Sequence, residues 1–233
     1  MARQFQGLNA QTHKNLRIKK DLPLNSLEKQ QAVPVVLSEM PKLAAEFPLV
    51  FLRQSNGELA PFALFSLEPQ RNNFVEQGKW LAKRTPLALF NQPLILSQTK
   101  GNDYIVAVDM QSELIAGAED ESTVAMFNDD GSETEALKGR KQHLVHFTQQ
   151  QHQTREFTKL LVEYELIEPR QLVVESQGEK KELQSFFVLN QKKLEGLSQR
   201  KYIELKKLGV LYHCYAMIMS LEHLPSLLEN QSA

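Results

Sequence analysis

Four residues in this sequence have side chains suited to binding or converting a ligand: Trp80, Asp109, Glu113 and Tyr215. Carboxylates such as Asp109 and Glu113 could pair for acid–base work, and the rings of Trp80 and Tyr215 combine an apolar body with a polar end. An enzyme for a peptide or a small aromatic metabolite would use Trp80, Asp109 and Tyr215 first. Their spacing alone does not bring them together, so they are candidate binding residues and no catalytic residue is predicted.

Two other patterns contain possible metal ligands. His143 and His146 lie three residues apart on a predicted helix, a spacing at which both rings can face one metal ion. No third ligand follows at a fixed spacing, and we expect the two rings on the solvated face. The segment 127–133, "FNDDGSE", lacks the alternating acidic ligands of a calcium loop, and its Asp130-Gly131 pair predicts a turn. The sequence therefore predicts no metal and no cofactor.

The single cysteine, Cys214, stands between His213 and Tyr215 on another predicted helix. Adjacent residues on a helix point in different directions, so this spacing does not build a nucleophile–base pair, and we expect Cys214 to be a small buried hydrophobe. The chain also lacks the nucleophile elbow, the P-loop and the dinucleotide-binding glycine motif.

Bulk composition indicates a soluble protein with a full-sized core. The chain has 233 residues, 42% of them hydrophobic, and its 27 basic and 28 acidic residues nearly cancel. This balance disfavours a nucleic-acid binder, which needs excess positive charge. One cysteine cannot form an internal disulfide, no secretory segment opens the chain, and no uncharged run reaches the ~20 residues of a membrane span. We therefore expect a cytoplasmic protein without a membrane span, and the oligomeric state stays open.

Prolines mark the elements around residues 32–53, "AVPVVLSEMPKLAAEFPLVFLR". The pattern predicts a strand, a helix capped by Ser38 with Pro41 in its first turn, and a second strand after Pro48. A functional alternative is that this segment forms the rim of a groove for a peptide or a partner protein.

The remaining patterns divide the chain into a β-rich first half and a more helical second half. Residues 1–31 are polar and are expected to form an extended arm. A hairpin at Asn56-Gly57 is predicted, with Pro61 marking its second strand as an edge or entry position. Further predicted features are strands at 93–97 and 104–110 and an irregular acidic loop at 111–133.

In the second half, residues 134–168 have helical periodicity that Pro169 would end. The middle of this helix, "TQQQHQT", is polar nearly all round, so we expect it to be exposed or to cross another element at a polar contact. A second hairpin over 170–190 and a buried helix over 210–224 follow. Strands and helices segregate, so the predicted fold class is α+β, with residues 1–233 forming a single domain.

Several segments together resemble one protein family, the bacterial SapC-like family, over roughly residues 13–224. The resemblance implies no established reaction, cofactor or catalytic residue. Members often occur beside flavin-dependent halogenase-like proteins, cupin-like proteins and outer-membrane receptor genes, which implies an accessory role. The chain departs from the family pattern after Trp80, where relatives more often read W-x-x-x-Y-x-P and this chain has Arg84-Thr85-Pro86. It departs again at Ala216-Met217, where relatives more often have alanine followed by histidine. The segments that carry the resemblance are "HKNLRI", "QAVPVV", "EFPLVFLR", "GKW", "TPLALFNQPLIL", "VAVD", "AMFNDDGSETEAL" and "LGVLYHCYAMIMSLEHL".

Two functional hypotheses follow. The first is a non-catalytic cytoplasmic accessory or binding protein, an adaptor for a peptide or protein partner. The second is an enzyme acting on a peptide or small aromatic metabolite in a pocket between the β-rich half and the C-terminal helix. A surface-layer structural component follows only from the family's name and fits poorly with the absence of an ordinary export signal.

Overall fold

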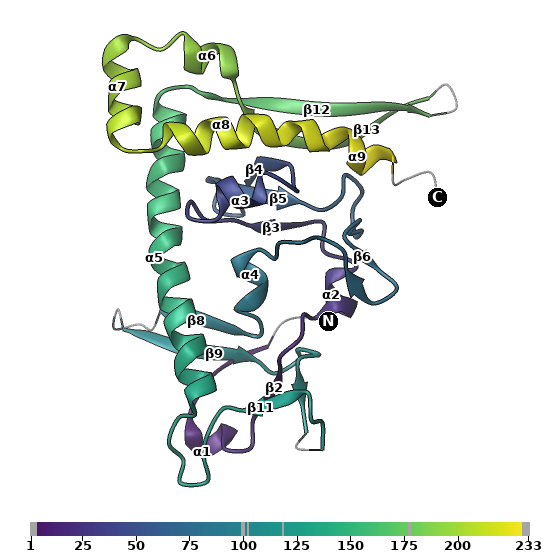
Figure 1. Cartoon of the computed structure of the whole chain (residues 1–233), viewed down its shortest axis with the longest axis vertical. Helices are drawn as coiled ribbons and strands as arrows, with labels where there is room; N and C mark the ends of the chain where they lie inside the picture. Colours follow the sequence, from purple (N-terminus) through teal and green to yellow (C-terminus); the bar gives the residue numbers. More distant parts are fainter. Residues whose placement is uncertain (1–3, 99–100, 102, 118, 177–178, 230–233) are drawn as a thin grey trace. The chain divides into compact units, whose positions relative to one another are not determined.

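The computed structural model describes residues 4–98, 101, 103–117, 119–176 and 179–229 (Figure 1). The chain combines several antiparallel sheets with a long helix and a helical C-terminal segment, so the predicted α+β class is confirmed. Backbone contacts group the chain into two compact units, the first formed by Met1–Ser26 with Leu87–Gln149 and the second by Leu27–Pro86 with Gln150–Ala233. That residues 1–233 behave as one domain stays a prediction.

The first unit contains two small antiparallel sheets, with strand orders β1-β9-β8 and β10-β2-β11. Residues 1–31 were expected to form a polar arm, and this expectation is wrong for the described part of that segment. Ile18 is fully buried. It lies on β2, which pairs with β10 on one side and with β11 on the other. The elements of this unit are β1 (Phe5–Gly7), α1 (Ala10–His13), β2 (Arg17–Lys19), α2 (Leu24–Leu27), α4 (Leu87–Phe90), β8 (Leu94–Gln98), β9 (Tyr104–Asp109), β10 (Ile115–Ala116), β11 (Thr123–Ala125) and the first half of α5 (Glu135–Glu163).

The acidic segment 111–133 is more regular than its composition predicts. Its strands β10 and β11 both pair with β2. The predicted turn at Asp130-Gly131 is confirmed, since Gly131 has φ +82° and the N–H of Ser132 donates to Asp130 Oδ1 at 2.8 Å. A positive φ at this position favours glycine.

The second unit contains a five-stranded antiparallel sheet with the order β12-β13-β4-β5-β3. The hairpin at Asn56-Gly57 is confirmed, with Gly57 at φ +84°. Of the two alternatives for Pro61, the edge strand is wrong, because β3 pairs with the residues that follow Pro61 and makes β5 an interior strand. Pro61 instead lies near the start of β5, before the residues that pair with β3, which agrees with the entry alternative. The elements of this unit are β3 (Ala32–Pro34), α3 (Met40–Leu43), β4 (Leu49–Arg53), β5 (Leu59–Leu64), β6 (Val75–Glu76), β7 (Lys79–Trp80), the second half of α5, β12 (Ile167–Ser176), β13 (Glu179–Leu189), α6 (Gln191–Glu195), α7 (Gln199–Lys207), α8 (Leu211–Ser220), the 3₁₀ turn η1 (Leu221–His223) and α9 (Leu224–Glu229).

The predicted order of strand, helix and strand across residues 32–53 is confirmed, although α3 has only four residues. Pro41 lies in the first turn as expected. Ser38 is not the cap, because Glu39 occupies that position and its Oε1 accepts a hydrogen bond from the N–H of Val36 at 3.0 Å. The longer glutamate thereby closes the loop between β3 and α3.

Helix α5 ends at Glu163, before the predicted boundary, and Pro169 lies inside β12. The backbone conformation after Glu163, rather than the proline, ends the helix. Glu165 has φ +56°, and the N–H of Leu166 donates to Leu161 O at 2.9 Å. A residue in the left-handed region ends a helix in this way.

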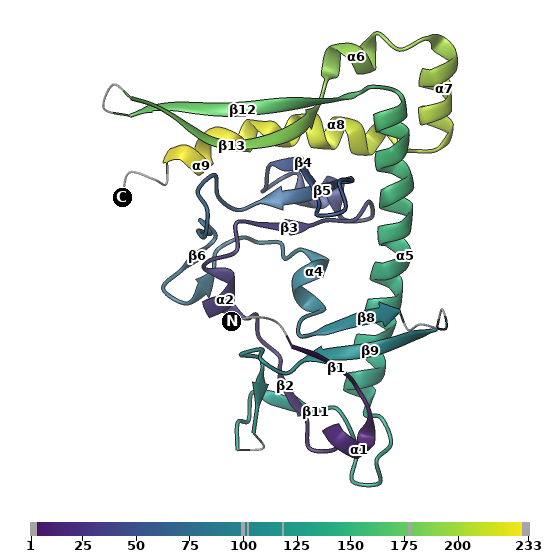
Figure 2. The same ribbon diagram turned by 180° about the vertical axis from the view of Figure 1, so that it is seen from behind.

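Helix α8 buries one face rather than its whole surface. It contacts α3, β4 and β13, and both views show it beside the β12–β13 hairpin (Figures 1 and 2). Its outer face leaves Tyr212 at 67% and Met219 at 71% exposed. In the described part of the chain, no helix combines the length and apolar character needed to cross a membrane. The buried positions recur at helical spacing and are Leu211, Cys214, Met217 and Ser220.

Candidate functional site

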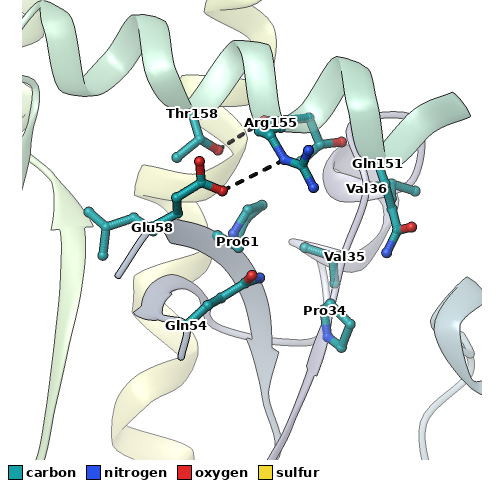
Figure 3. A pocket seen from close by; sticks show the side chains of 12 residues that line it. Pro34, Val35, Val36, Gln54, Glu58, Pro61, Gln151, Arg155 and Thr158 are labelled. Atoms are coloured by element: carbon teal, nitrogen blue, oxygen red, sulfur yellow. Dashed lines mark hydrogen bonds and ion pairs between the residues drawn. The ribbon is translucent and has the colours of Figure 1, made fainter. Parts of the chain in front are cut away.

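A groove in the second unit lies where β3 ends, between the β4–β5 hairpin and α5 (Figure 3). We call it the β3–α5 groove. Its cavity measures about 140 Å³, room for about five water molecules at liquid density. The twelve residues that line it are Pro34, Val35, Val36, Gln54, Glu58, Leu59, Ala60, Pro61, Gln151, Thr154, Arg155 and Thr158.

The sheet side of the groove is apolar and has few free backbone donors. The N–H of Val35 donates to Pro61 O at 3.1 Å, so Val35 faces β5 and the backbone of Pro34 points away from it. Pro34 has no N–H to offer an added strand, and Ala32 O already accepts from Gln30 Nε2 at 3.3 Å. This edge is therefore protected against pairing with another strand.

The helix side is held in place by one buried side chain. Thr154 Oγ1 accepts a hydrogen bond from the N–H of Leu37 at 2.9 Å and donates to Gln150 O at 2.7 Å. Thr158, one turn later, donates to Thr154 O at 2.9 Å. Both threonines are almost fully buried, at 4% and 3% exposed. Part of the polar run in α5 thus crosses another element at a polar contact, which was one of the two expectations for it.

An ion pair closes one side of the groove. Arg155 Nε lies 3.8 Å from Glu58 Oε2, and both side chains are about half exposed (Figure 3). A pair of this kind contributes about 0–1 kcal/mol to stability. It can therefore reorganise at little cost, and it leaves the groove with one charge of each sign. The side-chain amides of Gln54 and Gln151 add donors and acceptors.

Trp80 is part of an aromatic cluster. Its ring centroid lies 5.4 Å from that of Phe65 and 6.2 Å from those of Phe47 and Phe74. Its Nε1–H donates to Arg84 O at 3.1 Å. With the indole nitrogen satisfied and the ring in contact with three phenylalanines, the geometry is that of packing.

The two carboxylates considered for acid–base work have different partners in the first unit. Asp109 Oδ1 accepts from the N–H of Gln4 at 3.0 Å and from that of Gln111 at 3.1 Å. Glu113 Oε1 accepts from the N–H and the hydroxyl of Ser26, at 2.8 and 2.6 Å. Partial burial raises the pKa of Glu113, but these hydrogen bonds outweigh it and hold the pKa below its usual value. Asp109 therefore holds the backbone at Gln4 in place, and Glu113 holds the segment at Ser26.

The candidates on α8 are separated as helical geometry requires. Tyr215 hydrogen-bonds with Tyr202, and this bond raises the pKa of Tyr215. Cys214 faces the core, and burial raises the pKa of its thiol to about 12. The ring of His213 instead stacks edge-on with Phe157, their centroids 6.2 Å apart. The expectation that Cys214 is a buried hydrophobe is confirmed.

The two candidate metal ligands, His143 and His146, are exposed on α5, as expected. No group of three or more potential ligand residues lies together in the part of the chain that the structure describes.

The groove residues Gln54, Gln151 and Arg155 were not singled out from the sequence. Gln54 lies at the β4–β5 hairpin, and Gln151 and Arg155 lie on successive turns of α5, so the three meet only where α5 packs against that hairpin. The signal that pointed to this place was the proline-rich stretch 32–53, which supplies Pro34, Val35 and Val36.

Fold and groove together define an α+β protein with a small groove of mixed polarity. The family model described as SapC matches residues 8–227, so the chain belongs to the SapC family. No curated protein and no solved structure matches the chain.

Proposed function

We propose that this protein is a non-catalytic binding protein that holds an extended segment of a partner polypeptide in the β3–α5 groove. The observation that carries the proposal is the lining of the groove, which places amide groups and one charge of each sign around an apolar floor. A peptide presents the matching chemistry, because each of its amide units donates and accepts one hydrogen bond.

Side chains rather than strand pairing would recognise the partner. Because the edge of β3 lacks a donor at Pro34, a partner cannot extend the sheet there. The amides of Gln54 and Gln151 face the partner backbone instead. A cavity of about 140 Å³ accepts one aliphatic side chain of the partner, which would pack on Pro34, Val35 and Pro61.

The ion pair between Arg155 and Glu58 would separate when a charged group of the partner binds to either residue. Arg155 has donors that Glu58 does not occupy, and an exposed pair costs little to separate. A carboxylate in the partner segment would then bind Arg155, and a cation would bind Glu58. The groove therefore suits a segment of near-neutral charge.

The family context supports an accessory role, working beside halogenase-like or cupin-like proteins in the cytoplasm. The lone cysteine and the near-zero net charge fit that setting. The alternative, an enzyme using Trp80, Asp109 and Tyr215, stays a prediction, and no contact of these residues favours it.

Site-specific photo-crosslinking tests the proposal. A photoreactive amino acid at Gln151, inside the groove, is expected to capture a partner segment in the native cell. The same amino acid at Gln153, on the opposite side of α5, is the matched control. A synthetic peptide of the captured segment should bind the purified protein, and Gln151→Ala should weaken binding by about tenfold, whereas Gln153→Ala should not.

Equal capture from both positions would contradict the groove as the binding site. So would a captured peptide whose affinity is unchanged by Gln151→Ala and by Gln54→Ala, both at polar residues that line the groove. Circular dichroism on each variant confirms that the fold is retained.

A further inference from the structure

A second cavity, in the first unit, has a different chemistry. It lies between α4 and the first half of α5 and measures about 400 Å³, within the range of small-molecule sites. We call it the Arg140 pocket. Its lining residues are Leu87, Phe90, Asn91, Arg140, His143, His146 and Phe147.

Arg140 is a partly buried cation whose hydrogen-bond partners among the described residues are neutral carbonyl groups. It donates to Gln92 O at 3.1 Å and to Lys19 O at 3.3 Å. Among the described residues, no carboxylate forms an ion pair with it. Burial lowers the pKa of Arg140, yet a guanidinium keeps its charge in proteins. A buried charge without a counter-ion is costly, so an anion bound here would offset an existing penalty.

Further donors line the same pocket. Asn91 also lines the pocket, but its Nδ2 is buried beneath the wall and has no hydrogen-bond partner among the described residues. His143 and His146 follow Arg140 by one and two turns of α5. No acidic residue lines the pocket. Its polar groups thus select against cations and for an acceptor.

The rest of the wall is apolar. Leu87 and Phe90 come from α4 and Phe147 from α5. Phe90 is 55% exposed, a large unburied area for a phenylalanine. An apolar body would cover such a ring, and the burial of apolar area favours binding.

We propose that the Arg140 pocket binds a small organic carboxylate with an aromatic body. The carboxylate would accept hydrogen bonds from Arg140, and the ring would pack against Phe90 and Phe147. This site is separate from the groove and does not depend on the proposed function.

Isothermal titration with phenylacetate tests the proposal on the full chain. We expect saturable binding at one site and at least about tenfold weaker binding of phenylacetamide, which has the same shape without the charge. Arg140→Gln should weaken phenylacetate binding by about tenfold or more. Lys138→Gln is the matched control, because it removes one exposed positive charge from the same helix and should leave binding unchanged.

Phe90→Ala provides a second variant, since that side chain is largely exposed and its loss should not unfold the unit. It should weaken phenylacetate binding several-fold. Absence of saturable binding, equal affinity for phenylacetamide, or equal weakening by Lys138→Gln would each overturn the proposal. Stronger binding of phenylphosphate than of phenylacetate would overturn the proposal that the ligand is a carboxylate and would assign the pocket to phosphate esters.

Discussion

The hydroxyl of Thr154 accepts a hydrogen bond from the backbone N–H of Leu37, 117 residues earlier in the chain, at 2.9 Å. This bond joins α5 to the segment that follows β3. It gives the N–H of Leu37 a partner outside the sheet, and Thr154 is one of the residues that line the β3–α5 groove.

Replacing this hydroxyl by a methyl group should destabilise the second unit. Thr154→Val keeps the shape but leaves the N–H of Leu37 without its partner, so we expect a loss of about 1–3 kcal/mol in the free energy of unfolding, measured by urea denaturation. Thr158→Val is the control, because that hydroxyl bonds only to Thr154 O in its own helix. Equal losses from the two variants would show that the contact with Leu37 carries no special weight.

Ser220 makes a comparable contact on α8. Its Oγ accepts from the N–H of Leu49 at 2.9 Å and donates to Met217 O at 2.6 Å, fully buried. Ser220→Ala leaves the buried N–H of Leu49 without a partner, so it should lower the free energy of unfolding by about 1–3 kcal/mol. The exposed Ser226, which bonds only to His223 O, should tolerate alanine with little change in the denaturation midpoint. A midpoint for Ser220→Ala that matches wild type would refute the prediction.

The thiol of Cys214 should be inert in the native protein. With its pKa raised to about 12, only about one thiol in 10⁵ is ionised at pH 7, against a few per cent for an ordinary cysteine. Mass spectrometry should therefore find little iodoacetamide adduct until urea unfolds the chain, and labelling should increase as the pH rises. Ser226→Cys in a Cys214→Ala background is the exposed control. Rapid native labelling of Cys214 would disprove this assignment.

Glu113 should make stability depend on pH. Its pKa is lower in the folded chain than the usual value, because Ser26 donates two hydrogen bonds to the carboxylate. The stabilisation is therefore present above the unfolded pKa of about 4.3 and is lost as the pH falls through the folded value. Urea titrations should show Glu113→Gln less stable than wild type at pH 7, with the gap shrinking on acidification. A gap between Glu113→Gln and wild type that stays constant from pH 7 down through the acid range would contradict this prediction.

Local signals predicted much of the fold. Asn56-Gly57 marks the β4–β5 hairpin, and the apolar runs at 93–97 and 104–110 correspond to β8 and β9. These features depend on neighbouring residues alone. The errors occur where contacts between residues far apart in the sequence determine the structure. Pro61 lies in a strand that β3 makes interior, and Ile18 is buried on β2, between β10 and β11.

Both cavities depend on contacts that the sequence pattern does not reveal. Arg155 and Glu58 are almost a hundred residues apart and meet only once α5 lies against the hairpin. In the sequence, Arg140 cannot be told from the other polar residues of its helix, because the segment 87–92 that surrounds its side chain is about fifty residues away. Trp80, by contrast, was noticed for its rarity, and its three ring contacts explain it as packing.

The position of that tryptophan makes the protein its own optical probe. The chain has a single tryptophan, and it lies in the second unit. Indole emission during heating should thus follow the second unit alone, while far-ultraviolet circular dichroism follows the whole backbone. Superimposable melting curves would indicate one cooperative body, and a displaced pair of curves would indicate two that melt independently.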